Sequence, residues 1–148
     1  MALAGCGFSP VFGTGGTASV MRGAIDYDTP ATTAGFAMRQ RLEDQLGLAQ
    51  TARFQLRTTL TQTTEAAAVT PSGDTTRFHL RGTSGWELAT LDGTVLGAGD
   101  VQSFTSYSST GSTVATQAAT DDARDRLSVA LADLIVAQVL VLQVGPAQ

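Results

Sequence analysis

The apolar residues of this 148-residue chain repeat with two different periods, and this change of period constrains the fold more than any other feature. Between residues 31 and 49 they recur every three to four positions, as on one face of an α-helix. The members of this stripe are Ala31, Ala34, Met38, Leu42, Leu46 and Ala49. From Phe54 onwards apolar residues recur every second position, as on one face of a β-strand. The sequence therefore predicts a fold that combines helices with a sheet.

The first helix is expected over residues 31–46. Pro30 and Thr32 or Thr33 form a typical helix start. Gly47 follows at the position where a glycine often ends a helix. The charged residues of this segment fall outside the apolar stripe, so we expect them to form a solvated face.

Four strands are expected, the first of them before this helix. They cover residues 20–27, 53–60, 77–88 and about 94–106. In the second and third strands apolar and polar side chains alternate, so each strand has one apolar and one polar face. The first strand alternates imperfectly and contains Gly23. A Pro-Ser-Gly-Asp turn sequence at residues 71–74 lies between the second and third strands.

The last two strands are expected to form a β-hairpin. The dipeptide Asp-Gly at residues 92–93 lies between them and is a strong signal for a tight turn. Within the last strand the alternation changes phase between Val95 and Phe104. Such a change predicts a β-bulge, which we place near Gly97 or Gly99.

A second helix is expected near the C-terminus, beginning between Thr113 and Asp121. Asp121 and Asp122 suit an early turn, because acidic side chains interact favourably with the positive end of the helix dipole. The apolar stripe of this helix comprises Ala123, Leu127, Ala130, Leu131, Leu134 and Val141. The stretch 127–144 also contains Asp133 and two glutamines, so it fits a buried amphipathic helix better than a membrane-spanning one.

These elements follow the order β-α-β-β-β-α. This order predicts an α/β (α+β) fold of two layers, in which two helices pack on one face of a mixed four-stranded sheet and the other face stays polar. The β-α-β unit should join parallel strands by a right-handed crossover. The strands that follow it should form an antiparallel meander.

Charge excludes one class of partner and points to another. The chain has 9 basic and 13 acidic residues and a pI near 4.7, whereas nucleic-acid binders normally carry a basic surface. The basic residues are all arginines, which can form bidentate contacts with phosphate or carboxylate groups. Several of them share the polar face of the second and third strands with the single histidine. The members of this arginine face are Arg53, Arg57, Arg77, His79 and Arg81.

Two interpretations of the arginine face remain open. It can be a solvated sheet face with ordinary cross-strand ion pairs, such as arginine with Glu87. Alternatively, it binds phosphate or carboxylate groups of a glycolipid or protein partner. Neighbouring strands lie about 4.8 Å apart, so in this second interpretation arginines from both strands could converge on one phosphate.

No catalytic or metal site is visible in the sequence. His79 is the only histidine, and no serine or cysteine nucleophile is placed to use it. One histidine and one cysteine far apart do not make a metal ligand set. The glycine-rich residues 13–16 follow no predicted strand and lack lysine, so they do not form a phosphate loop. The sequence therefore predicts neither an enzyme nor a cofactor.

The only cysteine, Cys6, follows Leu3-Ala4-Gly5, as in a bacterial lipobox. In such a motif the cysteine becomes the lipid-modified N-terminus. Alternatively, Cys6 is a buried or incidental thiol in a disordered N-terminus. The five residues before Cys6 are too few for a secretory leader, so we expect the exported precursor to carry a leader ahead of them. The expected organisation is a lipobox remnant with a flexible tether at 1–19, a single α/β domain at 20–144 and a disordered tail at 145–148.

Two separated segments resemble the same protein family. Residues 5–13, Gly-Cys-Gly-Phe-Ser-Pro-Val-Phe-Gly, resemble the mature N-terminus of the lipopolysaccharide-assembly lipoproteins, the LptE family. Ser106-Tyr107 and the run Asp-Ala-Arg-Asp-Arg-Leu at 122–127 resemble the last strand and final helix of that family. Between them the resemblance lies in the order of the elements.

This resemblance implies a function. It implies an outer-membrane lipoprotein on the periplasmic side, anchored through Cys6, that plugs and helps to assemble a β-barrel partner. It also implies binding of lipopolysaccharide on its way to the cell surface, for which the arginine face would supply the contacts to anionic groups. The alternatives are an auxiliary lipoprotein of a phospholipid transporter, which also places a lipobox before a small α/β domain, and a free-standing structural lipoprotein of the envelope.

Overall fold

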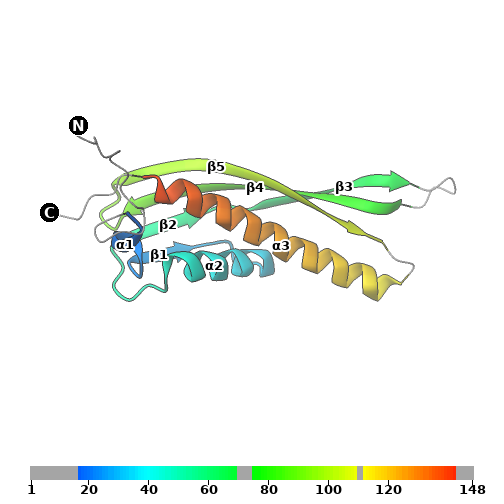
Figure 1. Cartoon of the computed structure of the whole chain (residues 1–148), viewed down its shortest axis with the longest axis horizontal. Coiled ribbons are helices and arrows are strands. Elements are labelled where there is room, and N and C mark those ends of the chain that lie inside the picture. Colours follow the sequence, from blue (N-terminus) through cyan, green and yellow to red (C-terminus); the bar gives the residue numbers. More distant parts are fainter. Residues whose placement is uncertain (1–16, 70–74, 110–111, 143–148) are drawn as a thin grey trace, which may run out of the picture.

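The computed structural model describes residues 17–69, 75–109 and 112–142. The elements are α1 (Thr17–Met21), β1 (Ile25–Asp28), α2 (Thr33–Leu46), β2 (Phe54–Thr58), β3 (Thr61–Val69), β4 (Thr75–Thr90), β5 (Val95–Ser108) and α3 (Thr113–Leu140). Helices α2 and α3 lie on one face of a mixed sheet, which confirms the predicted two-layer α/β fold (Figure 1). Cys6, the turn predicted at 71–74 and the tail at 145–148 lie outside the described residues.

Strand β4 is the centre of the sheet. Its three neighbours are all antiparallel to it: β2 and β3 follow one another along one edge of β4, and β5 pairs along the other edge over nearly the whole length. Strand β1 pairs in parallel with β2, as predicted for the two strands that flank α2. The molecule is elongated because β4, β5 and α3 all run along its long axis (Figure 1).

Strand β3 is the element that differs most from the sequence prediction of four strands. Its described side chains are exposed from Thr63 to Ala67, so no alternation of buried and exposed residues marks it as a strand. Backbone pairing with the first half of β4 holds it in place instead. An edge strand of this kind depends on its neighbour rather than on its own side-chain pattern, and periodicity therefore misses it.

The N-terminal part of the domain also differs from the prediction. We expected a tether up to Ser19 and a strand over residues 20–27, whereas α1 begins at Thr17 and β1 covers only Ile25–Asp28. Between them Gly23 has a φ of 73°, a left-handed conformation that turns the chain sharply. The apolar side chain of Met21 is fully buried, so α1 is part of the core rather than of a tether.

Helix α2 agrees with the prediction at both ends. The Thr32 hydroxyl accepts a hydrogen bond from the Gly35 N–H at 3.1 Å and caps the N-terminus. Gly47 ends the helix with a φ of 88°. Within the predicted stripe Met38, Leu42 and Leu46 are buried and Ala34 is partly exposed. Ala31 and Ala49 are exposed because they lie outside the helix.

Helix α3 begins at the first residue of the predicted range and is buried along a stripe that agrees only in part with the predicted one. It begins at Thr113, so Asp121 and Asp122 lie in its third turn rather than near its N-terminus. Its buried residues are Ala123, Leu127, Ser128, Leu131, Ala132, Ile135, Val136 and Val139. The prediction was wrong for Leu134 and Val141, which are exposed. The buried stripe follows steps of four residues because one side of α3 packs on the sheet and an adjacent side packs on α2.

Glycine allows α3 to approach the sheet closely. A Cβ atom added to Gly82 would lie 2.9 Å from side-chain atoms of both Leu127 and Leu131. The predicted bulge in β5 is confirmed, because the register with β4 shifts between Val95 and Gly97. In the part of the chain that the structure describes, no helix is long and apolar enough to cross a bilayer.

Candidate functional site

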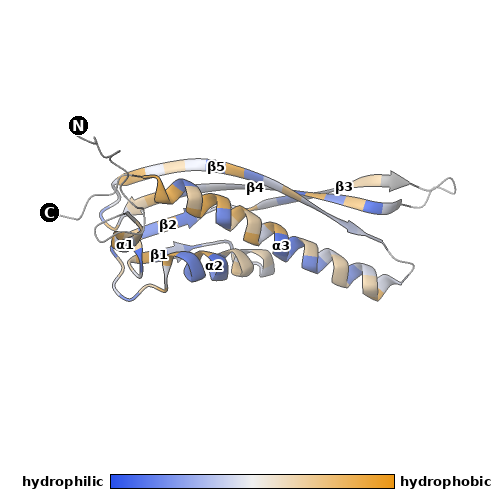
Figure 2. Cartoon of the chain, viewed as in Figure 1, coloured by the Kyte–Doolittle hydropathy of each residue, from blue (hydrophilic) through white to orange (hydrophobic). Residues whose placement is uncertain are grey.

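The uncovered face of the sheet carries the side chains that the sequence placed there. Phe54, Leu56 and Leu80 are buried, so the residues that alternate with them on β2 and β4 point away from the helices. Figure 2 shows apolar residues concentrated on α3 and the adjoining parts of the sheet, with hydrophilic segments at the far end of β4. The side chains predicted to form the arginine face therefore share one side of the sheet.

The strand register divides these side chains into two groups. Arg57 on β2 lies opposite Glu87, whereas Arg81 lies opposite Thr63 on β3. These two positions lie six residues apart along β4, which corresponds to about 20 Å. The expectation that arginines of the two strands converge on one phosphate is wrong, because β3 occupies the place beside Arg81 where we expected β2.

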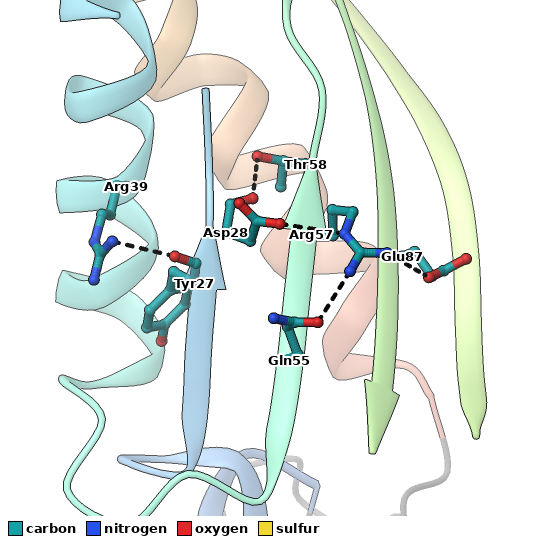
Figure 3. Close-up of polar contacts among 7 residues, drawn as sticks. All are labelled: Tyr27, Asp28, Arg39, Gln55, Arg57, Thr58 and Glu87. Carbon is teal, nitrogen blue, oxygen red and sulfur yellow. Dashed lines mark hydrogen bonds and ion pairs between the residues drawn. The ribbon is translucent and has the colours of Figure 1, made fainter. Parts of the chain in front are cut away.

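In the first group Arg57 is held between two carboxylates (Figure 3). Its Nε atom lies 3.2 Å from Asp28 Oδ2, and its Nη1 atom lies 3.6 Å from Glu87 Oε1. Its Nη2 atom donates a further hydrogen bond to Gln55 Oε1 at 3.2 Å. The cross-strand ion pairs link β1, β2 and β4, and an incoming anion would have to compete with both carboxylates.

The guanidinium of Arg53 makes structural contacts. Its Nη2 atom donates to the Val20 carbonyl oxygen at 2.7 Å, and its Cζ atom lies 5.4 Å from the centre of the Phe54 ring. Arg53 therefore fixes α1 against β2. It also lines an open pocket of about 420 Å³, which Arg22 and Leu48 line as well.

Tyr27 and Arg39 fasten α2 to the edge of the sheet beside this group. The Tyr27 hydroxyl donates to the Gly47 carbonyl at 2.9 Å, and Arg39 Nη1 donates to the Tyr27 carbonyl at 3.2 Å (Figure 3). Burial raises the pKa of the Tyr27 phenol, so this hydroxyl stays protonated and keeps its donor role. The first group is thus a rigid, largely paired part of the fold.

The second group lies on β4 and β5. We define the β4 patch as Arg77, His79, Arg81 and Phe104. Phe104 lies directly opposite Arg81 on β5 and is 72% exposed. A pocket of about 170 Å³ is lined by His79, Arg81 and Phe104, and a shallow pocket of about 270 Å³ beside it is lined by threonine side chains and Gln102. The β4 patch therefore combines an aromatic ring with basic side chains, and threonine hydroxyls lie beside it on the same open surface.

Contacts within the β4 patch define what it can do chemically. Arg81 Nε donates to Glu65 Oε2 at 3.3 Å, and both side chains are more than half exposed. His79 Nδ1 lies 2.8 Å from the Ser106 hydroxyl. Glu65 is the register partner of His79 but pairs with Arg81, so no relay from carboxylate through histidine to serine forms. The arrangement suits binding of an anion rather than catalysis.

Phe104 is the residue of this surface that the sequence did not reveal. The helix-facing side of β5 includes Gly97 and Gly99, which the side chains of Leu142 and Gln138 approach closely. An aromatic residue therefore looked like part of the apolar face, although it lies on the opposite one. Its register partner Arg81 is the signal that places it, and register is known only from the structure.

Among the described residues, no group of acidic, histidine or cysteine side chains could hold a metal ion. A family model for LptE, described as lipopolysaccharide-assembly, matches residues 23–139, which is more than half of the chain. The chain belongs to the LptE family. The match includes every strand of the sheet and the C-terminal segment that carried the resemblance, and it confirms the family; residues 5–13 lie before it.

Three solved structures share the fold of this LptE protein. A protein from Caulobacter crescentus CB15 that is assigned as a lipoprotein superposes with a TM-score of 0.68 at 22% identity, over 84% of this chain and 92% of that one. The minor lipoprotein of Acinetobacter baumannii gives 0.64 at 19% identity, over 87% and 98%. Rare lipoprotein B of Shewanella oneidensis gives 0.59 at 12% identity, over 78% and 90%. No curated protein matches the sequence.

Membership of this family indicates the process in which the protein acts. LptE proteins are non-enzymatic lipoproteins of lipopolysaccharide assembly, so the protein acts in that process and in the cell envelope rather than as an enzyme. Cys6, the predicted site of lipid attachment, lies outside the described residues and before the matched segment.

Proposed function

We propose that this LptE protein is anchored through Cys6 to the periplasmic side of the outer membrane, plugs a β-barrel partner and binds lipopolysaccharide. The observation that carries the proposal is the sheet face that α2 and α3 leave uncovered, because it is polar and elongated. Family membership supports a role in lipopolysaccharide assembly. The barrel, the anchor and the bound lipid are what the experiments below test.

The uncovered sheet face has the chemistry of a surface that contacts a barrel lumen. The interiors of outer-membrane barrels are polar, whereas their outer surfaces carry an apolar band about 25 Å tall. Strand β4 has 16 residues, which corresponds to about 50 Å. The sheet is thus long enough to extend through such a barrel, and its arginine, glutamine and threonine side chains can hydrogen-bond to a polar wall.

Co-expression with the barrel encoded by the same organism should give a one-to-one complex that remains intact in detergent. The physical reason is the large polar sheet face, which a barrel lumen would cover on several sides at once. The measurement is affinity purification of a tagged chain followed by mass determination. If the tagged chain instead brings down only subunits of an inner-membrane transporter, the auxiliary role in phospholipid transport replaces the barrel proposal.

The β4 patch is the proposed contact for the anionic groups of lipopolysaccharide. Arginine binds phosphate with charged, often bidentate hydrogen bonds, and the exposed ring of Phe104 offers an apolar surface beside it. Arg53 and Arg57 belong to the sequence-based proposal too, but Arg53 is held by the Val20 carbonyl and Arg57 lies between two carboxylates. Arg81 pairs with one carboxylate, that of the exposed Glu65, so an incoming anion has less to displace there. The proposal therefore centres on Arg77, His79 and Arg81.

Replacing Arg77 and Arg81 together with glutamate should weaken lipopolysaccharide binding at least about tenfold, which is about 1.4 kcal/mol. A charged hydrogen bond contributes about 1.5–3 kcal/mol, and solvent and salt reduce this value at an exposed surface. The loss should be larger at low salt, while the melting temperature changes little because both side chains are exposed. Binding can be measured by titration with fluorescent lipopolysaccharide across a salt series.

The matched control is the double change of Arg124 and Arg126 to glutamate. These arginines lie on α3, which covers the opposite side of the sheet, and they form exposed ion pairs with Asp121 and Asp122. The control alters the net charge by the same amount, so it should leave most of the affinity intact. Equal losses in the two variants would show a general charge effect, and unchanged binding in the first would reduce the β4 patch to a solvated surface.

A further inference from the structure

One end of the molecule exposes aliphatic side chains from three separate segments. Leu48 lies in the connection from α2 to β2, Leu91 and Val95 lie on the two sides of the β4–β5 hairpin turn, and Val141 follows α3. Their exposed fractions are 69% for Leu48, 62% for Leu91, 53% for Val95 and 74% for Val141. We call these four residues the apolar end surface. Isolated exposed aliphatic residues are common, but several at one end mark an interaction site.

Contacts between the segments show that they meet. The Leu91 N–H donates to the carbonyl oxygen of Arg53 at 3.3 Å, and Arg53 and Leu48 line the same pocket. On the other side of this end, the Leu142 side chain lies 2.8 Å from the place where a Cβ atom on Gly97 would be. The beginning of α1 lies at the same end of the molecule (Figure 1).

We propose that the apolar end surface rests on the phospholipid bilayer that holds the Cys6 anchor, and this inference rests on the anchor proposed above. Residues 7–16 separate Cys6 from Thr17, the first residue of α1. Even fully extended, the chain from Cys6 to Thr17 reaches at most about 40 Å. An anchored Cys6 therefore keeps this end of the domain, and not the β3–β4 hairpin end, close to the membrane.

Because the anchor would hold this end near the bilayer, a small apolar surface is enough to bind it. A tether converts a weak second contact into an intramolecular one, at an effective concentration that reaches the millimolar range for short linkers. Aliphatic side chains at a membrane surface enter the boundary between headgroups and acyl chains, about 5–10 Å deep. The contact should consequently form when the chain is tethered and be nearly undetectable for the untethered protein.

The charges at this end indicate which lipids it accepts. Arg22 lines the adjoining pocket and can contact lipid phosphate, whereas Arg53 beside it already donates to the Val20 carbonyl oxygen. Asp92 in the hairpin turn and Asp44 near the end of α2 add negative charge at the same end. Hydrogen bonds from the neighbouring threonines hold the pKa of Asp92 below its usual value. Because the charges are mixed, the contact should be similar on zwitterionic and on anionic bilayers and should depend on the aliphatic side chains.

The experiment uses the full chain, coupled through its only thiol to a maleimide lipid in phosphatidylcholine vesicles. Valine occurs in exposed positions at both ends of α3, so Val141→Trp and Val114→Trp form a matched pair of fluorescent reporters. Trp86 is buried and contributes the same background to both. Brominated acyl chains should quench Val141→Trp at least about threefold more than Val114→Trp, because they quench only side chains that reach the acyl boundary.

Equal quenching of the two reporters, or none at either, would overturn the proposal. Adding Leu48→Ser and Leu91→Ser to Val141→Trp should abolish its excess quenching while circular dichroism shows an unchanged fold. If the uncoupled protein forms a dimer that Leu91→Ser dissociates, a second copy covers this surface and the proposal is wrong. The lipid is attached chemically here, so this result does not depend on whether Cys6 is acylated in cells, which palmitate labelling measures separately.

Discussion

Replacing Leu131 with alanine should lower the free energy of unfolding by about 2–5 kcal/mol. The Leu131 side chain is fully buried, and it lies where α3 approaches Gly82 most closely. The substitution removes apolar contacts and leaves a cavity that the sheet cannot fill, because glycine offers no side chain at that position. Chemical denaturation monitored by circular dichroism measures the loss.

Leu134 provides the matched control for this experiment. It lies one turn further along the same helix, but it is 41% exposed. Leu134→Ala should therefore cost no more than about 1 kcal/mol, since less apolar surface leaves water on folding. Similar losses for the two variants would mean that the buried stripe of α3 is displaced by about one residue, as the sequence pattern alone had suggested.

Replacing Cys6 with serine should abolish lipid attachment in cells. With a secretory leader present, the unchanged protein should incorporate labelled palmitate and sediment with the membranes. The serine variant should do neither, because serine provides no thiol for acylation and each buried methylene otherwise adds about 0.8 kcal/mol of membrane affinity. Stable anchoring needs more than one acyl chain, so the change from bound to free should be nearly complete.

A second variant separates the position of the thiol from its presence. Cys6→Ser combined with Ser9→Cys restores one cysteine to the segment but moves it away from the small residues Ala4 and Gly5. This protein should remain unlabelled, because a lipobox requires the cysteine directly after the small residues. Palmitate incorporation that survives Cys6→Ser would show that another residue carries the lipid.

The apolar pattern predicted most elements of the fold because it is a local property. Met38, Leu42 and Leu46 fall on one side of α2, and the cap residues Thr32 and Gly47 end it as expected. The alternation in β2 and β4 likewise assigned the buried and the polar side of each strand correctly. Whether a face is apolar or polar follows from the side chains two residues apart in a strand, or three to four residues apart in a helix.

The candidate site could be predicted only in part. Sequence alternation placed Arg57 and Arg81 on the same polar face, but they lie about 20 Å apart along β4. Phe104 was not recognised as part of this surface. The distance between the two arginines and the position of Phe104 both depend on which residues pair across strands. This pairing is set by the hairpin turns and by the way β2 and β3 share one edge of β4.

The sequence by itself determined the types of the main elements, the polar character of one sheet face and the family to which the chain belongs. Only the tertiary structure decided the fifth strand, the stripe along which α3 is buried and the meeting of Leu48, Leu91 and Val141 at one end. The physical reason is the range of the interactions. Periodicity reports contacts between residues a few positions apart, whereas register, close packing and shared surfaces arise from residues distant in the chain.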